Sequence, residues 1–203
     1  NEPILKAPSA ILFLIGLMVS IHIILTKILS SGLSTSLFLN LAFVPDDFSR
    51  GDKLWTLISY AFLHGSWEHL IMNMVWLLAF GSAVAKRIES AKIYLLFFLL
   101  CCVIAIQVQY FFSQESLIPI IGASGGVAAM LGASARFAFS VDIFSNSNRR
   151  PRLLPLRKVF TNGTTLMFVL LWVVLNLLFG LISVSPGGAS VSVAWQAHLG
   201  GFF

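Results

Sequence analysis

The sequence predicts an all-α, polytopic membrane protein organised as a single domain over residues 1–203. Hydrophobic residues make up 58% of the chain and charged residues only 10%, whereas a soluble domain of this length needs a far more charged surface. The apolar residues also gather in blocks of about 18–22 residues, the length that crosses a bilayer core as an α-helix. A helix satisfies its own backbone hydrogen bonds, so each block is interpreted as a membrane-spanning helix.

Six such blocks follow one another along the chain. The expected spans are residues 8–29, 69–85, 91–112, 122–139, 164–184 and 194–203. The sixth has only ten residues before the sequence stops at Phe203, which is too short to cross a bilayer. We therefore expect this helix to be truncated and the natural protein to continue beyond it.

Lys and Arg residues are unevenly divided between the two sides of this six-span arrangement. Ten of them fall on one side, and only Lys27, Arg50 and Lys53 fall on the other. Cytoplasmic loops carry the excess of positive charge, so the N-terminus is expected in the cytoplasm. The net charge of +5 then follows from topology, and no nucleic-acid partner is needed. The basic run at residues 149–158 is interpreted as a cytoplasmic loop that faces lipid.

The outer loop at residues 30–67 is too apolar for a free loop. It contains hydrophobic runs at residues 37–39 and 54–63. Apolar segments of this kind bind at the boundary between headgroups and acyl chains. We expect the loop to fold back and lie partly in the membrane interface.

The two cysteines give no sign of a metal or redox site. Cys101 and Cys102 are adjacent within the third span, which disfavours a disulfide between them, and a metal would need further ligands nearby. They are interpreted as small apolar filler. The sequence therefore predicts no metal and no other cofactor.

Polar side chains inside such apolar helices are costly in lipid, so they usually have a partner or a role. His69 and Asn73 are four residues apart near the start of the second span, on one face of that helix. Ser124 lies at the start of the fourth span and His198 near the start of the sixth. With the orientation set by the charges, all three spans begin at the outer side, so these groups share one depth. Together they can supply a nucleophile, a base and oxyanion donors.

Small residues dominate the fourth span between residues 122 and 135. They let neighbouring helices approach closely, so this span is expected at the centre of the bundle. Gly200 and Gly201 in the sixth span would likewise let that helix come close enough for His198 to reach Ser124.

Three short motifs resemble those of the rhomboid family of intramembrane serine proteases. The string Gly122-Ala123-Ser124-Gly125 is similar to the family's nucleophile motif, and Ala197-His198-Leu199-Gly200 is similar to its sixth-helix histidine motif. The set of His64, His69 and Asn73 resembles the second-helix pattern. The resemblance covers essentially the whole chain, including the long first loop, and it implies a bundle of six transmembrane helices.

The resemblance also implies a Ser–His dyad without a third, acidic member. Ser124 would attack a peptide carbonyl, and His198 would take its proton. His69, Asn73 and the backbone at Ala123 and Ser124 would bind the substrate and its oxyanion. His64 would line the polar cavity that admits water.

Two positions depart from the family's pattern. The family commonly has Trp-Arg in the first loop, whereas this chain has Trp55-Thr56, so an arginine that ties the loop together is missing there. In well-known members an aromatic residue one turn after the serine stacks on the histidine, and here that residue is Ala128. Both changes bear on rate and substrate range more than on the type of reaction.

The expected function is that of an intramembrane serine endopeptidase. Its substrates would be single-pass transmembrane proteins, cleaved near the outer membrane boundary. Six spans without an additional one favour a bacterial inner membrane, with the active site toward the periplasmic side.

Two alternatives from other classes stay open. A non-enzymatic rhomboid-like protein would bind membrane clients without cutting them, although such relatives usually lack the serine or the histidine. A polar-lined transporter would show inverted repeats and broken helices at the midplane, and the sequence shows neither. The six spans exclude a soluble serine hydrolase.

Overall fold

The computed structural model describes residues 7–138, 153–182 and 194–203. Within these ranges every extended regular element is a helix, and the one β-type pairing is an isolated antiparallel bridge between Phe43 and Ile120. The all-α class predicted from the sequence is confirmed. The described elements, in chain order, are α1 (Ser9–Ile23), η1 (Ile24–Ile28), α2 (Ser31–Leu41), α3 (Pro45–Ser49), α4 (Thr56–Ser59), η2 (Tyr60–Phe62), α5 (Trp67–Trp76), η3 (Leu77–Gly81), α6 (Ser82–Ile88), α7 (Ala91–Phe112), α8 (Ser124–Ala138), α9 (Leu156–Val159), α10 (Gly163–Ile182) and α11 (Trp195–Phe202).

Four helical stretches of the described chain are long and apolar enough to cross a membrane. They are Ser9–Ile28, Trp67–Ile88, Ala91–Phe112 and Gly163–Gly180. The first is α1 continued by the π-helical turn η1, and the second is α5 continued through η3 into α6. Two further helices, α8 with 15 residues and α11 with 8 described residues, overlap the expected fourth and sixth spans.

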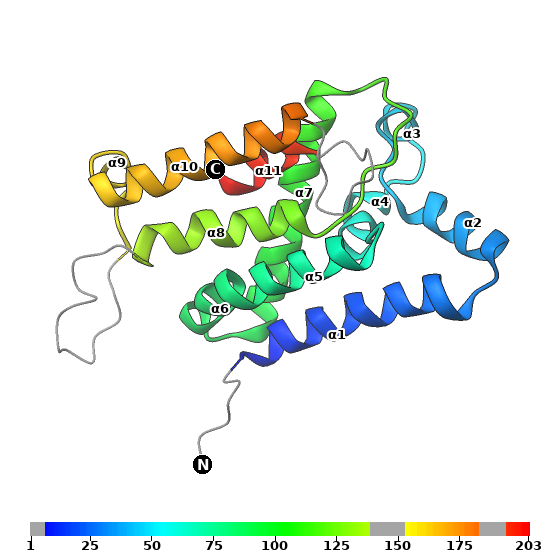
Figure 1. Ribbon diagram of the computed structural model, residues 1–203, viewed down its shortest axis with the longest axis horizontal. Coiled ribbons are helices and arrows are strands. Elements are labelled where there is room, and N and C mark those ends of the chain that lie inside the picture. Colours follow the sequence, from blue (N-terminus) through cyan, green and yellow to red (C-terminus); the bar gives the residue numbers. More distant parts are fainter. Residues whose placement is uncertain (1–6, 139–152, 183–193) are drawn as a thin grey trace, which may run out of the picture.

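Helix α8 lies at the centre of the bundle. It contacts α5, α6, α7, α10 and α11, and Figure 1 shows it running between α10 on one side and α5 on the other. Its small residues explain how so many helices can reach it. A Cβ atom added at Gly125 would stand 2.6 Å from the Cβ of Ala105 on α7, and one at Gly201 of α11 would meet the Gly125 backbone. Such approaches leave room for glycine alone.

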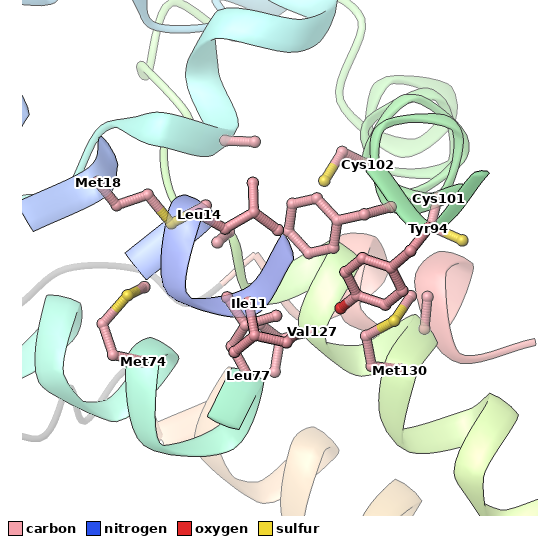
Figure 2. Close-up of a cluster of buried hydrophobic side chains, with 14 of the residues drawn as sticks. Ile11, Leu14, Met18, Met74, Leu77, Tyr94, Cys101, Cys102, Val127 and Met130 are labelled. Carbon is pink, nitrogen blue, oxygen red and sulfur yellow. The ribbon is translucent and has the colours of Figure 1, made fainter. Parts of the chain in front are cut away.

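The main hydrophobic cluster joins α1 to the middle of the bundle. Figure 2 shows side chains from α1, α5, η3, α7 and α8 meeting in one group, which includes Ile11, Leu14, Met18, Met74, Leu77, Tyr94, Cys101, Cys102, Val127 and Met130. Both cysteines are free thiols, and Cys102 is fully buried. They therefore fill space in the core, as expected from the sequence.

The loop between η1 and α5 is folded and held by its own hydrogen bonds. Helix α2 and the short helices α3 and α4 lie within it. The indole Nε1 of Trp55 donates to the carbonyl of Asn40 at 2.9 Å, and Ser59 Oγ donates to the carbonyl of Leu41 at 2.7 Å. The Leu54 and Trp55 side chains stay more than half exposed, which suits the expected contact with the membrane interface.

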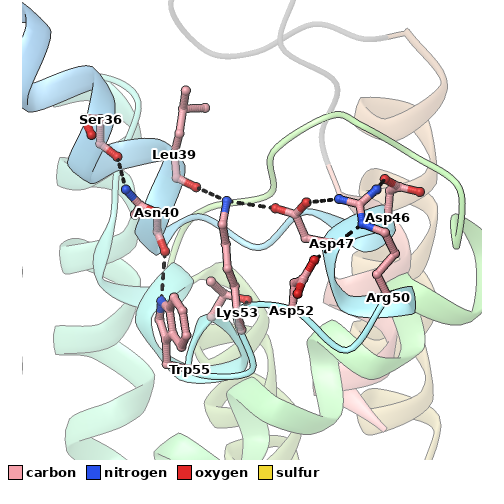
Figure 3. Close-up of polar contacts among 10 residues, drawn as sticks. Ser36, Leu39, Asn40, Asp46, Asp47, Arg50, Asp52, Lys53 and Trp55 are labelled. Atoms are coloured by element: carbon pink, nitrogen blue, oxygen red, sulfur yellow. Dashed lines mark hydrogen bonds and ion pairs between the residues drawn. The ribbon is translucent and has the colours of Figure 1, made fainter.

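Ion pairs close the turn between α3 and α4. Arg50 bonds the carboxylates of Asp46, Asp47 and Asp52, and Lys53 Nζ lies 2.9 Å from Asp47 Oδ2 (Figure 3). Thr56 is buried, and its hydroxyl donates to the carbonyl of Lys53 at 2.7 Å. The loop thus has an arginine tie at Arg50, six positions before Thr56.

A substitution at Gly201 tests the close approach of α11 to α8. Gly201→Ala would place a methyl group against the Gly125 backbone, and backbone yields less readily than a side chain. We expect a loss of about 1–3 kcal/mol in the free energy of unfolding, measured by thermal unfolding in detergent. Gly16→Ala is the matched control, because nothing lies within 4 Å of a Cβ added there. Equal stability of the two variants would contradict the packing described here.

Candidate active site

Ser124 and His198 meet at one end of the bundle. Ser124 is the first residue of α8, and His198 lies in the first turns of α11. The distance from His198 Nε2 to Ser124 Oγ is 2.7 Å, that of a good hydrogen bond. The two groups come from positions 74 residues apart, so only the close packing of α11 on α8 brings them together.

The turn before α8 depends on a glycine. Gly122 has a φ of +111°, a conformation that residues with a side chain rarely adopt. Its N–H donates to the carbonyl of Tyr60 at 3.0 Å, which anchors the turn to the end of the first loop. A Cβ at Gly122 would stand 2.8 Å from the imidazole Nε2 of His69. The absent side chain therefore lets the His69 ring lie directly beside the Gly122 turn.

His69 and Asn73 lie on α5, as the spacing indicated. Ser66 caps this helix by accepting a hydrogen bond from the His69 N–H at 3.2 Å. Asn73 is buried, and its Nδ2 donates to the carbonyl of His69 at 2.9 Å. The structure thus brings the His69 ring to the Gly122 turn, whereas the Asn73 amide bonds to its own helix.

His64 and Ala123 border the same region. The His64 side chain is buried before the start of α5, and its ring centroid lies 5.1 Å from that of His69 in an edge-to-face contact. Burial, and to a smaller extent the nearby His69 and His22 rings, lower the pKa of His64 to about 3. Ala123 is fully buried, and its methyl group packs within the main hydrophobic cluster.

Asn176 is a site residue that the sequence reasoning missed. It is buried on α10, and its Oδ1 lies 2.8 Å from His198 Nδ1. Its position inside the apolar fifth span was an available signal, because an amide in lipid needs a partner. Ser124, His198 and Asn176 form a continuous chain of hydrogen bonds across α8, α11 and α10.

The arrangement suits nucleophilic catalysis. A serine hydroxyl bonded to an imidazole can give up its proton as it attacks an electrophile. Within the described residues, no group of three or more His, Cys, Asp or Glu side chains is placed to hold a metal ion.

Comparison with known proteins decides the family. The model of the Rhomboid domain matches residues 51–203, which is most of the chain. The chain belongs to the rhomboid family. With its four apolar helices of spanning length, it is an integral membrane protein.

Several curated rhomboid proteins are similar in sequence. The Rhomboid protease GlpG of Serratia proteamaculans is 38% identical over 52 residues, or 26% of this chain. GlpG of Klebsiella pneumoniae is 34% identical over 89 residues, or 43% of the chain. RHOMBOID-like protein 4 of Arabidopsis thaliana is 31% identical over 154 residues, or 75% of the chain. The aligned parts span 19%, 30% and 32% of these relatives' own lengths.

Ala128 takes no part in the rhomboid site. It is buried in a second cluster with Leu131 and Phe202, and a methyl side chain has no ring to stack on His198. The imidazole of His198 is therefore held in place by residues other than Ala128.

A substitution at Gly122 tests whether the turn before α8 requires a glycine. Gly122→Ala combines an unfavourable φ with a clash against His69, and such strain costs about 1–3 kcal/mol. We expect the Ser124 hydroxyl to shift and its labelling by a fluorophosphonate probe to slow at least tenfold. Gly65→Ala is the control, because its added Cβ would meet only Ile121 Cδ1 at 3.4 Å. Equal labelling rates for the two variants would show that the turn tolerates a side chain.

Proposed function

We propose that this rhomboid is an intramembrane serine protease in which Ser124 is the nucleophile and His198 the general base. The observation that carries the proposal is the 2.7 Å separation of Ser124 Oγ and His198 Nε2. Intramembrane polar groups are expensive unless they serve a purpose. A serine–imidazole pair at a helix start, within a family whose curated members include proteases, supports acyl transfer.

The proposed reaction proceeds in two halves. As Ser124 Oγ attacks the carbonyl carbon of the scissile peptide, His198 Nε2 takes the hydroxyl proton. The tetrahedral intermediate then collapses, and the imidazolium gives that proton to the leaving amine, so the peptide bond breaks and an acyl-enzyme remains. In the second half, His198 takes a proton from water, the hydroxide attacks the ester, and the proton returns to Ser124.

The oxyanion would be stabilised by groups around the nucleophile turn. The backbone N–H of Ser124 lies at the start of α8, where helix donors have no partner within the helix. The His69 ring lies against Gly122, and Asn73 follows one turn later on α5. We assign His69, Asn73 and the backbone at Ala123 and Ser124 to oxyanion and substrate binding. Each such donor is worth about 10²–10³ in rate. His64 would line the path of water.

The substrates are proposed to be single-pass transmembrane proteins. Because a protease must reach an extended backbone, segments with small or helix-breaking residues near the membrane boundary should be cut preferentially. The excess of Lys and Arg on one side of the spans supports a cytoplasmic N-terminus. The site then faces the outer side, and the chain would reside in a bacterial inner membrane.

Loss of either dyad residue should abolish turnover. Ser124→Ala removes the nucleophile, and His198→Ala removes the base, so each variant should lose at least about 10⁴-fold in rate on a transmembrane substrate in liposomes. A fluorophosphonate probe should label the parent protein and fail to label Ser124→Ala. Thr165→Val is the control. It changes a buried residue in the first turn of α10, away from His198, and should label normally. A parent that binds substrate but neither cleaves it nor reacts with the probe would be a client-binding rhomboid instead.

Asn73→Ala should weaken catalysis without ending it. If Asn73 acts as an oxyanion donor, its loss should lower kcat by about 10²-fold and leave KM nearly unchanged. Cleavage assays at several substrate concentrations separate the two constants. Since Asn73 also donates to the His69 carbonyl, the thermal stability of the variant is measured in parallel. An unchanged kcat in a folded variant would remove Asn73 from the proposed oxyanion site.

A further inference from the structure

Both ends of the Asn176 amide are engaged at the site. Its Nδ2 lies 3.0 Å from the carbonyl oxygen of Trp195, and its Oδ1 lies 2.8 Å from His198 Nδ1. The side chain is 7% exposed, so water competes little for these bonds. The amide therefore bridges the start of α11 and the imidazole on the same helix.

The directions of these hydrogen bonds follow from elementary chemistry. A backbone carbonyl can only accept, so the amide group that faces Trp195 must be the NH₂ group. The amide oxygen, which also can only accept, then faces His198 Nδ1. Nδ1 must carry the proton. In a neutral imidazole this leaves Nε2 as an acceptor, and Nε2 is the atom that lies 2.7 Å from Ser124 Oγ.

Packing holds the amide in this position. Gly180, one turn after Asn176 on α10, lies so close to Trp195 that an added Cβ would stand 2.5 Å from the indole ring. On the other side of Asn176, Trp172 stacks on Phe202 with ring centroids 4.1 Å apart. Helices α10 and α11 are thus joined on both sides of the bridge, so the amide is fixed relative to His198.

We propose that Asn176 is a positioning residue that holds His198 in the Nδ1–H tautomer and aims Nε2 at Ser124. The inference rests on the proposed function, in which His198 is the base. The dyad then becomes a chain of three side chains whose third member is a neutral amide from α10. Well-known family members orient the histidine by stacking an aromatic ring on it, and this chain has Ala128 at that position. The Asn176 amide would orient the imidazole by a hydrogen bond instead.

The first test needs no substitution at Asn176. In ¹⁵N-histidine NMR spectra of the parent protein in micelles, the resonances lost in His198→Ala belong to His198. We expect a protonated Nδ1 and an unprotonated Nε2 at neutral pH. A His198 protonated at Nε2 in the resting protein would overturn the proposal, and this outcome does not depend on whether the protein cuts any substrate.

The second test replaces the amide by an apolar side chain of similar size. In Asn176→Leu, we expect kcat to fall about 10–100-fold, by analogy with the loss of partners that orient metal-binding histidines. KM should stay unchanged, because Asn176 is not assigned to the substrate. The His198 signals should change to a mixture of tautomers. An Asn176→Leu protein with the parent's kcat and tautomer would overturn the inference.

Two further variants separate positioning from helix stability. Asn176→Asp keeps an acceptor oxygen for Nδ1–H and should recover most of the kcat lost in Asn176→Leu. Thr165→Val removes a buried hydrogen bond from the same helix, between Thr165 Oγ1 and Asn162 Oδ1, and should leave kcat and tautomer unchanged. Equal losses in Asn176→Asp, Asn176→Leu and Thr165→Val would assign the effect to α10 packing and contradict a positioning role.

Discussion

The contact on which the rest of the site depends is the approach of α11 to α8. A side chain at Gly201 would collide with the Gly125 backbone, and one at Gly125 would collide with Ala105 on α7. Helices in lipid gain little from the hydrophobic effect, so contact between small residues is what lets them associate closely. This spacing places the imidazole of His198 at hydrogen-bond distance from Ser124. A larger residue at either glycine would move the imidazole away from the serine.

Much of this arrangement was readable from the sequence because lipid allows few alternatives. The composition and the apolar blocks required helices, and the small residues of the fourth span predicted its central place, which α8 occupies. The distribution of Lys and Arg predicted one depth for Ser124, His198, His69 and Asn73, and the first three of these lie close together. These three are the side chains that the structure gathers around the Gly122 turn.

The sequence alone did not predict how each helix is rotated about its own axis, and so which way its side chains face. Asn176 lies near the end of the fifth span, which in the proposed orientation is the outer end, so the same depth argument extends to it. Whether its amide faces lipid or the bundle depends on how α10 is turned, and that is decided by Gly180 against Trp195 and by Trp172 against Phe202. The ion pairs of Arg50 with carboxylates that precede and follow it in the first loop were also not predicted from the sequence.

The amide of Asn176 has an electrostatic consequence for the resting protein. Soluble serine proteases place a carboxylate behind the histidine, and that anion is a formal charge that must be solvated or paired. Inside a bilayer, an unpaired anion would carry a desolvation cost of several kcal/mol. An uncharged dipole bonded to the Trp195 carbonyl and to the imidazole orients the ring while the chain of Ser124, His198 and Asn176 carries no net charge. In the proposed reaction, charge would separate only during turnover, when the imidazolium and the oxyanion would form together and balance one another at close range.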